Sequence, residues 1–159
     1  MFAHILLPHD PYVFRADGSL VTEAEAHAEK EPGLYAGHIA FANSQIKSLV
    51  GDLLSGPADT RPVVILQADE GPLACRSVDC VDTTAEYFKI RSGVLNAMYL
   101  PGVTDRLPDR WSNVNTFRFV FDHYFGTDLP LLPDRIFTWP DNDHLYDFQD
   151  VTDLVDGTP

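Results

Sequence analysis

The stretch Arg61-Pro62-Val63-Val64-Ile65-Leu66-Gln67-Ala68-Asp69-Glu70-Gly71-Pro72 decides the fold class of this chain. Its middle, residues 63–68, is dominated by β-branched and aliphatic side chains, which is typical of a strand covered on both faces. Asp69-Glu70-Gly71-Pro72 then ends the run with turn-forming residues. We therefore predict a buried strand whose end presents two adjacent carboxylates.

Strand and helix patterns alternate on both sides of this stretch. Apolar side chains recur at three- and four-residue steps in residues 34–54, as on one face of a helix, and Ser55-Gly56-Pro57 ends that pattern. A second helix has Ser112 or Asn113 as its cap and Gly126 after its last residue. Strands are predicted for residues 2–7, 63–68, 94–100 and 136–139, helices for 34–54 and 114–125, a solvated excursion with room for a short helix for 15–33, and a long loop for 73–90. This order predicts an α/β fold, a mixed sheet with helices on both faces.

Length and charge narrow the class of protein. With 159 residues the chain is predicted to form a single domain, residues 1–159, with an acidic surface tail over residues 141–159. The formal net charge of −13 argues against nucleic acid or an anionic membrane as the main partner, because both are bound by clustered Lys and Arg. The same charge suits a bound cation. No apolar run approaches the roughly 18–20 residues that span a bilayer.

The N-terminus and the cysteines say less about function. The first nine residues lack a basic region and carry His4 within the apolar stretch, so we do not expect them to act as a signal peptide. Cys75 and Cys80 lie beyond the acidic turn with four residues between them, and a disulfide and two free thiols are equally compatible with the sequence. Metal ligation by this pair is less favoured, because no further thiol or imidazole follows at short spacing.

The acidic pair is the strongest candidate site. Asp69 and Glu70 would repel each other at a strand end unless a positive group compensates, and hard divalent cations take such oxygen ligands. The alternative is that acidic residues end many strands simply because turns begin there. His9, placed at a predicted strand end between Pro8 and Pro11, is a candidate for contacting an anionic group or donating a proton. His4, within the predicted strand, is expected to be a core histidine.

A few polar residues in apolar surroundings are weaker candidates. Asn96, Asn113 and Asn115 could contact a ligand, but a buried hydrogen-bonded amide and helix caps are the favoured interpretations. Arg118 is expected to form a structural ion pair within its helix. No Gly-rich phosphate loop, G-x-S-x-G elbow or paired C-x-x-C motif occurs.

Several ordered motifs together resemble one family. Residues 2–14, Phe-Ala-His-Ile-Leu-Leu-Pro-His-Asp-Pro-Tyr-Val-Phe, are similar to an "HxLLPHxPF" segment, and residues 63–72 to a strand and turn that read "QGDHGP" or "QADEGP". Residues 95–102 resemble "LNAYYLPG", and residues 114–118 match "VNTFR". These segments occur in sulfatase-like proteins of the alkaline phosphatase superfamily, the branch that includes phosphoglycerol and phosphoethanolamine transferases. The resemblance covers Phe2 to about Thr152.

The resemblance implies a sulfatase-like fold and a metal-dependent hydrolase or transferase acting on sulfate or phosphate esters. Asp69 matches a metal-ligand position, Glu70 stands where many members have a His ligand, and His9 matches the histidine that contacts the anionic group of the substrate. The implied cofactor is a divalent cation: Mn, Mg, Ca or Zn. Family members usually face outward on a membrane anchor, but no signal or anchor is recognisable in this sequence, so the localisation stays open.

The family's nucleophile and first acidic metal ligand lie upstream of the "HxLLPHxPF" segment. We therefore expect the chain to be the C-terminal part of a catalytic domain, incomplete at the N-terminus and inactive alone, whose partner is the missing N-terminal portion or a second copy. Two alternatives stay open. The chain is a non-catalytic binding or interaction domain that retains the fold, or a self-contained hydrolase that uses His9 with Asp69 or Glu70 as acid and base.

Overall fold

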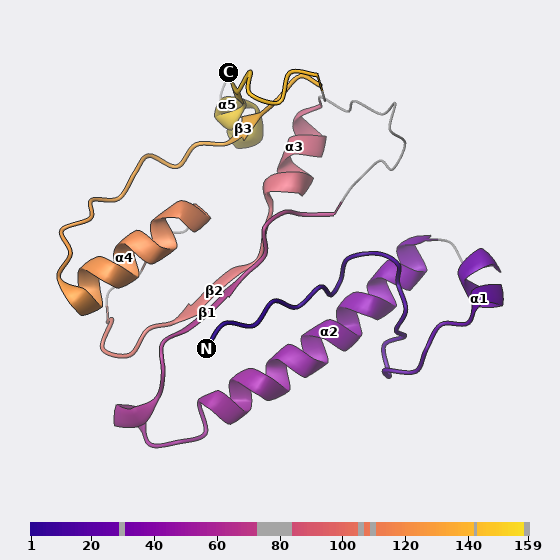
Figure 1. Ribbon diagram of the computed structural model, residues 1–159, viewed down its shortest axis with the longest axis horizontal. Helices are drawn as coiled ribbons and strands as arrows, with labels where there is room; N and C mark the ends of the chain where they lie inside the picture. Colours follow the sequence, from indigo (N-terminus) through magenta and orange to yellow (C-terminus); the bar gives the residue numbers. More distant parts are fainter. Residues whose placement is uncertain (29–30, 73–83, 105–106, 109–110, 142, 158–159) are drawn as a thin grey trace. The chain divides into compact units, whose positions relative to one another are not determined.

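A computed structural model of the chain describes residues 1–28, 31–72, 84–104, 107–108, 111–141 and 143–157 (Figure 1). Within these residues helices combine with two small antiparallel sheets, so the coarse α/β class is confirmed, whereas the predicted mixed sheet with helices on both faces is not formed by the described residues. The chain divides into two compact units, Met1–Pro62 and Val63–Pro159, and each is described by itself.

The unit Met1–Pro62 is built on the long helix α2 (Glu31–Leu53). This helix was predicted from residue 34 and begins earlier, because Pro32 is tolerated in a first turn, where backbone N–H groups have no partner inside the helix. Helix α1 (Glu23–Ala28) confirms the short helix expected among residues 15–33, and the 3-10 helix η1 (Ala58–Thr60) follows α2.

Histidine and aromatic rings form the interior of this unit. His38 of α2 is completely buried, and its Nδ1 accepts a hydrogen bond from the backbone N–H of Phe14 at 3.2 Å. The ring of Phe14 stacks on His38 and contacts Phe41, with centroids 5.8 Å and 4.8 Å apart. His4, expected in the core, is exposed instead, so the buried histidine of this unit is one to which the sequence pattern assigned no role.

The strand predicted for residues 2–7 is wrong. These residues pair with no strand in the described part of the chain, and Phe2 and Leu6 are exposed. An apolar run becomes a strand only where a neighbour satisfies its backbone N–H and C=O groups, and hydropathy alone does not supply that neighbour. The chain instead turns at His9, whose N–H donates to the carbonyl of Leu6 at 2.7 Å.

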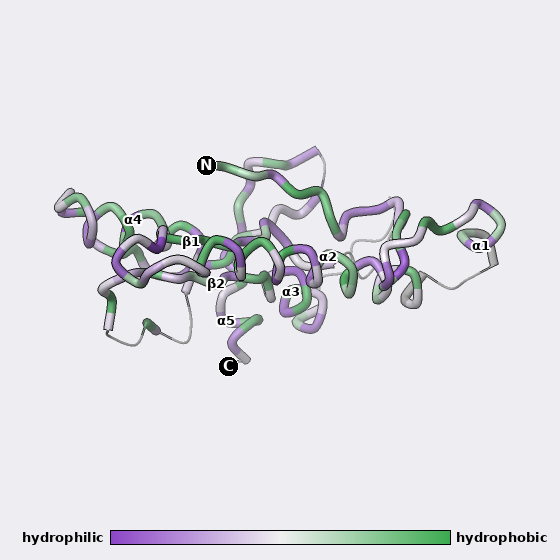
Figure 2. The backbone as a smooth tube through the Cα atoms, turned by 90° about the horizontal axis from the view of Figure 1, so that it is seen from below, coloured by the Kyte–Doolittle hydropathy of each residue, from purple (hydrophilic) through white to green (hydrophobic). Residues whose placement is uncertain are grey.

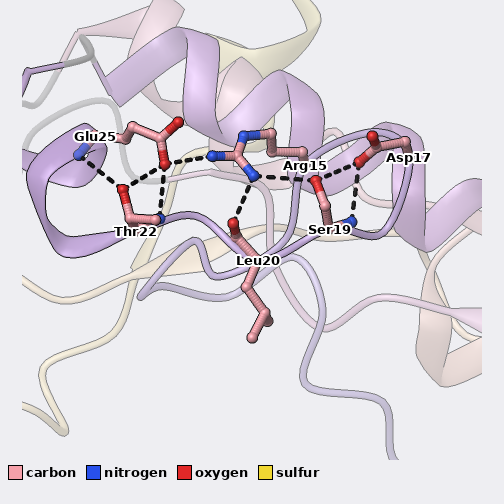
Figure 3. A network of polar contacts seen from close by, with 6 residues as sticks. All are labelled: Arg15, Asp17, Ser19, Leu20, Thr22 and Glu25. Carbon is pink, nitrogen blue, oxygen red and sulfur yellow. Dashed lines mark hydrogen bonds and ion pairs between the residues drawn. The ribbon is translucent and has the colours of Figure 1, made fainter.

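A polar network orders the segment before α1 (Figure 3). Thr22 and Glu25 form a capping box, in which the N–H of Thr22 donates to Glu25 Oε2 at 2.9 Å and the N–H of Glu25 donates to Thr22 Oγ1 at 3.4 Å. The guanidinium of Arg15 pairs with Glu25 and also donates to Ser19 Oγ and the carbonyl of Leu20. The bonds from Thr22, with the help of Arg15, lower the pKa of Glu25 to about 2.

The unit Val63–Pro159 begins with strand β1 (Val64–Gln67), which pairs antiparallel with β2 (Asn96–Tyr99). Both strands were predicted and both are confirmed. The register places Gln67 opposite Asn96. The expectation that the first strand is covered on both faces is wrong, because β1 belongs to a two-stranded ribbon and its side chains are only half-buried.

In the described part of this unit, three helices and a second small sheet accompany the ribbon. Helix α4 (Asn113–Phe125) has Ser112 at its N-cap and ends at Gly126, whose φ of 63° is left-handed, as the sequence predicts. The loop expected for residues 73–90 is wrong in its second half, because Ala85–Ser92 form helix α3. Residues 73–83, with Cys75 and Cys80, lie outside the described residues.

Residues 141–159, which were expected to form an acidic surface tail, contain a short strand and a short helix. Strand β4 (Gln149–Asp150) pairs antiparallel with β3 (Phe137–Thr138), which confirms a short strand within residues 136–139. Helix α5 (Thr152–Asp156) packs against α3, and Val151 before it is buried. Among the helices of the described residues, none combines the length and the hydropathy needed to cross a membrane.

Candidate functional site

The acidic turn follows directly on β1. Asp69 is exposed, and its Oδ1 accepts the backbone N–H of Glu70 at 2.9 Å. The side chain of Glu70 is also largely exposed and forms an ion pair with the guanidinium of Arg91. The structure thus brings the two predicted carboxylates together on one turn, with a cation of the chain beside one of them.

Arg91, in the last turn of α3, fixes one flank of the turn. Its Nη1 donates to the carbonyl of Gly71 at 2.5 Å, and the N–H of Gly71 donates to the carbonyl of Arg91 at 2.8 Å. This approach requires glycine, because a Cβ at position 71 would lie 2.0 Å from the carbonyl oxygen of Ile90. Gly71 therefore does more than permit a turn, and the sequence interpretation missed this role as well as that of Arg91.

Asn113, the first residue of α4, holds the other flank. Its Nδ2 donates to the carbonyl of Ala68 at 2.8 Å, one residue before Asp69. Its Oδ1 accepts from Nε2 of Gln67 at 3.2 Å and from Nδ2 of Asn96 at 3.1 Å. One amide side chain therefore joins the start of a helix to the end of β1 and to β2.

The hydroxyl of Thr116 is a shared acceptor beside this amide. It is fully buried and accepts from Gln67 at 2.7 Å, Asn96 at 3.2 Å and Trp111 at 3.0 Å. Asn115 is buried too and donates to the carbonyl of Leu132 at 2.8 Å. These contacts bear out the expectation that the asparagines are hydrogen-bonded structural amides.

The sequence did not single out Gln67, Trp111 or Thr116. The available signal was the pair of amides Gln67 and Asn96 in two otherwise apolar strands, which the register places opposite each other. Arg118 was expected to form an ion pair. In the described part of the chain its Nε donates instead to the carbonyl of Pro130 at 2.7 Å.

An open depression lies beside the amide network. It has a volume of about 300 Å³ and is lined by Val94, Asn96, Met98, Leu107, Pro108 and Trp111. Oδ1 of Asn96 is buried and has no hydrogen-bond partner in the described part of the chain.

His9 belongs to the other unit, Met1–Pro62. Its side chain is 75% exposed, and Nδ1 lies 2.6 Å from the carbonyl oxygen and 3.4 Å from Oδ1 of Asp10. Within Val63–Pro159 the structure brings Asp69, Glu70 and Arg91 together at the acidic turn after β1.

The donor chemistry of the turn fits a hard cation in part. Asp69 and Glu70 supply carboxylate oxygens, which Mn, Mg and Ca prefer, and both are open to solvent. Across the described ranges, however, no group of three or more His, Cys, Asp or Glu side chains is placed to hold a metal ion. The turn alone therefore offers an incomplete coordination shell.

No family model, curated protein or solved structure matches the chain. What the chain does is therefore inferred from its residues and their contacts.

Proposed function

We propose that the chain carries part of the site of a metal-dependent hydrolase or transferase of sulfate or phosphate esters, in a sulfatase-like domain of the alkaline phosphatase superfamily. Asp69 is the proposed ligand of a divalent cation, Mn, Mg, Ca or Zn, with Glu70 as the second carboxylate. His9 is the proposed contact of the anionic group of the ester. The order of four sequence motifs over most of the chain supports this proposal.

The observation that carries the proposal is the way the acidic turn is held. Asn113 fixes the backbone before Asp69, and Arg91 fixes the backbone at Gly71, while the carboxylate of Asp69 stays exposed. A metal ligand binds best when surrounding hydrogen bonds already hold it in place, because less conformational entropy is lost on binding. The turn meets this condition for Asp69.

The residues of the chain have separate tasks in this proposal. A bound cation would supply positive charge that polarises an ester oxygen. Asp69 contributes a negative oxygen ligand, Arg91 balances the charge of Glu70 and orients it, and the imidazole of His9 offers a hydrogen-bond donor to an anionic oxygen. No residue of the chain matches the family's nucleophile, so the isolated chain is not expected to turn over substrate.

Manganese binding tests this proposal directly. We expect the full chain to bind Mn²⁺ weakly in isothermal titration calorimetry, and Asp69→Asn to weaken binding by about tenfold or more, because the variant loses a charged oxygen ligand. Asp59→Asn, in η1, is the matched control and is expected to leave the affinity unchanged. Equal affinities of the parent chain and Asp69→Asn would contradict the proposed ligand.

The exposed apolar side chains of α4 favour a second candidate function, a non-catalytic interaction domain. In that case Asp69→Asn has no effect on metal or ester binding. The third reading, a self-contained hydrolase, requires the chain alone to hydrolyse 4-nitrophenyl sulfate or phosphate in the presence of a chelator.

A further inference from the structure

Helix α4 has three faces, and two of them are covered within its own unit. Thr116 and Val120 are buried on the face toward the amide network. The extended segment after the helix, residues 129–134, runs back along a second face. Hydrogen bonds tie that segment to the helix, from Asn115 to the carbonyl of Leu132, from Arg118 to the carbonyl of Pro130, and from the N–H of Leu129 to Asp122.

The third face is apolar and exposed. It carries Val114, Phe117, Phe121 and Phe125, spaced at three, four and four residues so that they lie in one line along the helix. Their exposed fractions are 61%, 49%, 45% and 72%. Consecutive phenylalanine rings lie with centroids 6.0 Å and 6.1 Å apart, so the side chains form a continuous stripe. Figure 2 shows hydrophobic residues recurring along this helix.

The size of this surface suits an interface between proteins. Taking about 150–250 Å² for a large apolar side chain, the three exposed rings, Val114 and the exposed Leu131 and Leu132 of the adjoining segment offer on the order of 500 Å². Two such surfaces together reach about 1,000 Å², the lower limit for a specific association. An apolar area on the order of 500 Å² lies within the range of the largest patch on a typical monomer, about 300–600 Å², and such patches are often functional.

The spacing of the stripe makes it complementary to itself. When two copies of α4 pack antiparallel about a two-fold axis, residues whose numbers have a constant sum face each other. Val114 then lies opposite Phe125 of the second copy, and Phe117 lies opposite Phe121, with the two pairs one residue, about 1.5 Å along the helix, from a common register. At each end of the contact the small side chain of Val114 meets Phe125, the most exposed ring. In the middle Phe117 meets Phe121, so the same pairs occur twice, as in an isologous contact.

We propose that the stripe formed by Val114, Phe117, Phe121 and Phe125 is a self-association surface that binds the same stripe of a second copy in antiparallel orientation. The proposal does not depend on the ester chemistry. The four side chains carry no charge, whereas each chain has a net charge of −13, so two copies repel each other at long range. Added salt screens that repulsion and is expected to strengthen the dimer, whereas it would weaken binding of a cationic partner.

Sedimentation equilibrium of the full chain tests the proposal. We expect a monomer–dimer equilibrium that shifts toward dimer between 50 and 500 mM NaCl. Phe121→Lys and Phe117→Glu are each expected to raise the dimer dissociation constant by tenfold or more, because a charge replaces a buried ring at the centre. Phe148→Glu, an exposed ring outside the stripe, is the control and leaves the constant unchanged. Far-UV circular dichroism establishes that each variant is folded.

Mixing the two variants tests the orientation. In an antiparallel pair, Glu at position 117 of one chain meets Lys at position 121 of the other, and the remaining Phe117 and Phe121 still face each other. The mixture is therefore expected to form a heterodimer that neither variant forms alone. A parent chain that stays monomeric at all concentrations would overturn the proposal and leave a different protein as the occupant. A mixture of folded variants that stays monomeric would overturn the antiparallel register.

Discussion

The two units use buried polar groups in different ways. In Met1–Pro62 the buried His38 accepts a single backbone hydrogen bond, and its Nε2 has no partner in the described part of the chain. In Val63–Pro159 the buried Thr116 accepts three side-chain bonds from different elements. The first unit is thus held by aromatic packing and capping near its surface, and the second by a network centred on one acceptor. The acidic turn belongs to the second, more strongly cross-linked unit.

Among the substitutions that test this comparison of the two units, replacing Gly71 is expected to have the largest effect on the free energy of unfolding. In Gly71→Ala the new Cβ would lie 2.0 Å from the carbonyl oxygen of Ile90, so the turn and α3 must separate. We expect the unit Val63–Pro159 to lose more than about 2 kcal/mol of unfolding free energy, as overpacked backbone contacts do. Urea denaturation followed by tryptophan fluorescence measures this, since both tryptophans, Trp111 and Trp139, lie in that unit.

Gly51 in α2 provides the control for this variant, because a Cβ there meets no atom within 4 Å. Gly51→Ala is expected to be neutral or to stabilise by roughly 0.5–1 kcal/mol, through the higher helix propensity of alanine. Far-UV circular dichroism follows the unfolding of this variant, because Met1–Pro62 contains no tryptophan. Similar losses in both variants would show that position 71 is not a close backbone contact.

Removing the shared acceptor is expected to have the next largest effect. Thr116→Val keeps the side-chain shape but leaves the donors of Gln67, Asn96 and Trp111 without that oxygen. The expected loss is about 1–3 kcal/mol of unfolding free energy, the usual cost of unsatisfied buried donors. Thr104→Val, at an exposed position, is expected to change little. A loss below about 0.5 kcal/mol in Thr116→Val would mean that the network contributes no more than surface contacts.

The smallest expected effect lies in Met1–Pro62 and depends on pH. The pKa of Glu25 is about 2 in the folded chain and 4.5 for the free side chain, so its ionised form stabilises the cap of α1 above about pH 4.5. This contribution is lost as the pH falls from 4.5 through 2. We expect protection of the Thr22 amide in hydrogen exchange to fall over that range.

Glu25→Gln removes the titrating group and should make the protection of Thr22 lower at neutral pH and nearly independent of pH. Glu86→Gln, in the first turn of α3, is the control and should leave the pH dependence at Thr22 intact. A parent chain with constant protection from pH 5 to pH 2 would show that the cap does not depend on the charge.

The sequence correctly predicted the helices and strands that are determined by residues close to one another in the chain. The helices of residues 34–54 and 114–125 follow from apolar periodicity and from Gly126, and the pairing strands β1 and β2 follow from their β-branched and aliphatic runs. The strand predicted for residues 2–7 is absent, because a strand needs a pairing partner elsewhere in the chain and local hydropathy does not show whether one exists. Helix α3 was missed because its apolar residues are few and its charged residues resemble a loop.

The candidate site was predictable only in its exposed part. Asp69 and Glu70 stand out as an acidic pair at the end of an apolar run, and the turn that they share is observed. The groups that hold the turn were not predictable, because Arg91 is 20 residues from Gly71 and Asn113 is 45 residues from Ala68 in the sequence. Such contacts follow from register and helix packing, which a single sequence does not encode locally.

Two hydrogen bonds join Gly71 and Arg91, one between their backbones and one from the guanidinium of Arg91, and they make the position of the carboxylates independent of the length of the connection that follows. These bonds close the chain from Gly71 to Arg91, which includes α3, so residues inserted between Gly71 and α3 enlarge a loop that is already closed. Doubling the length of such a loop costs only about 0.6 kcal/mol of closure entropy. Variants of this chain can therefore lengthen that connection, and add new binding groups to it, without displacing Asp69.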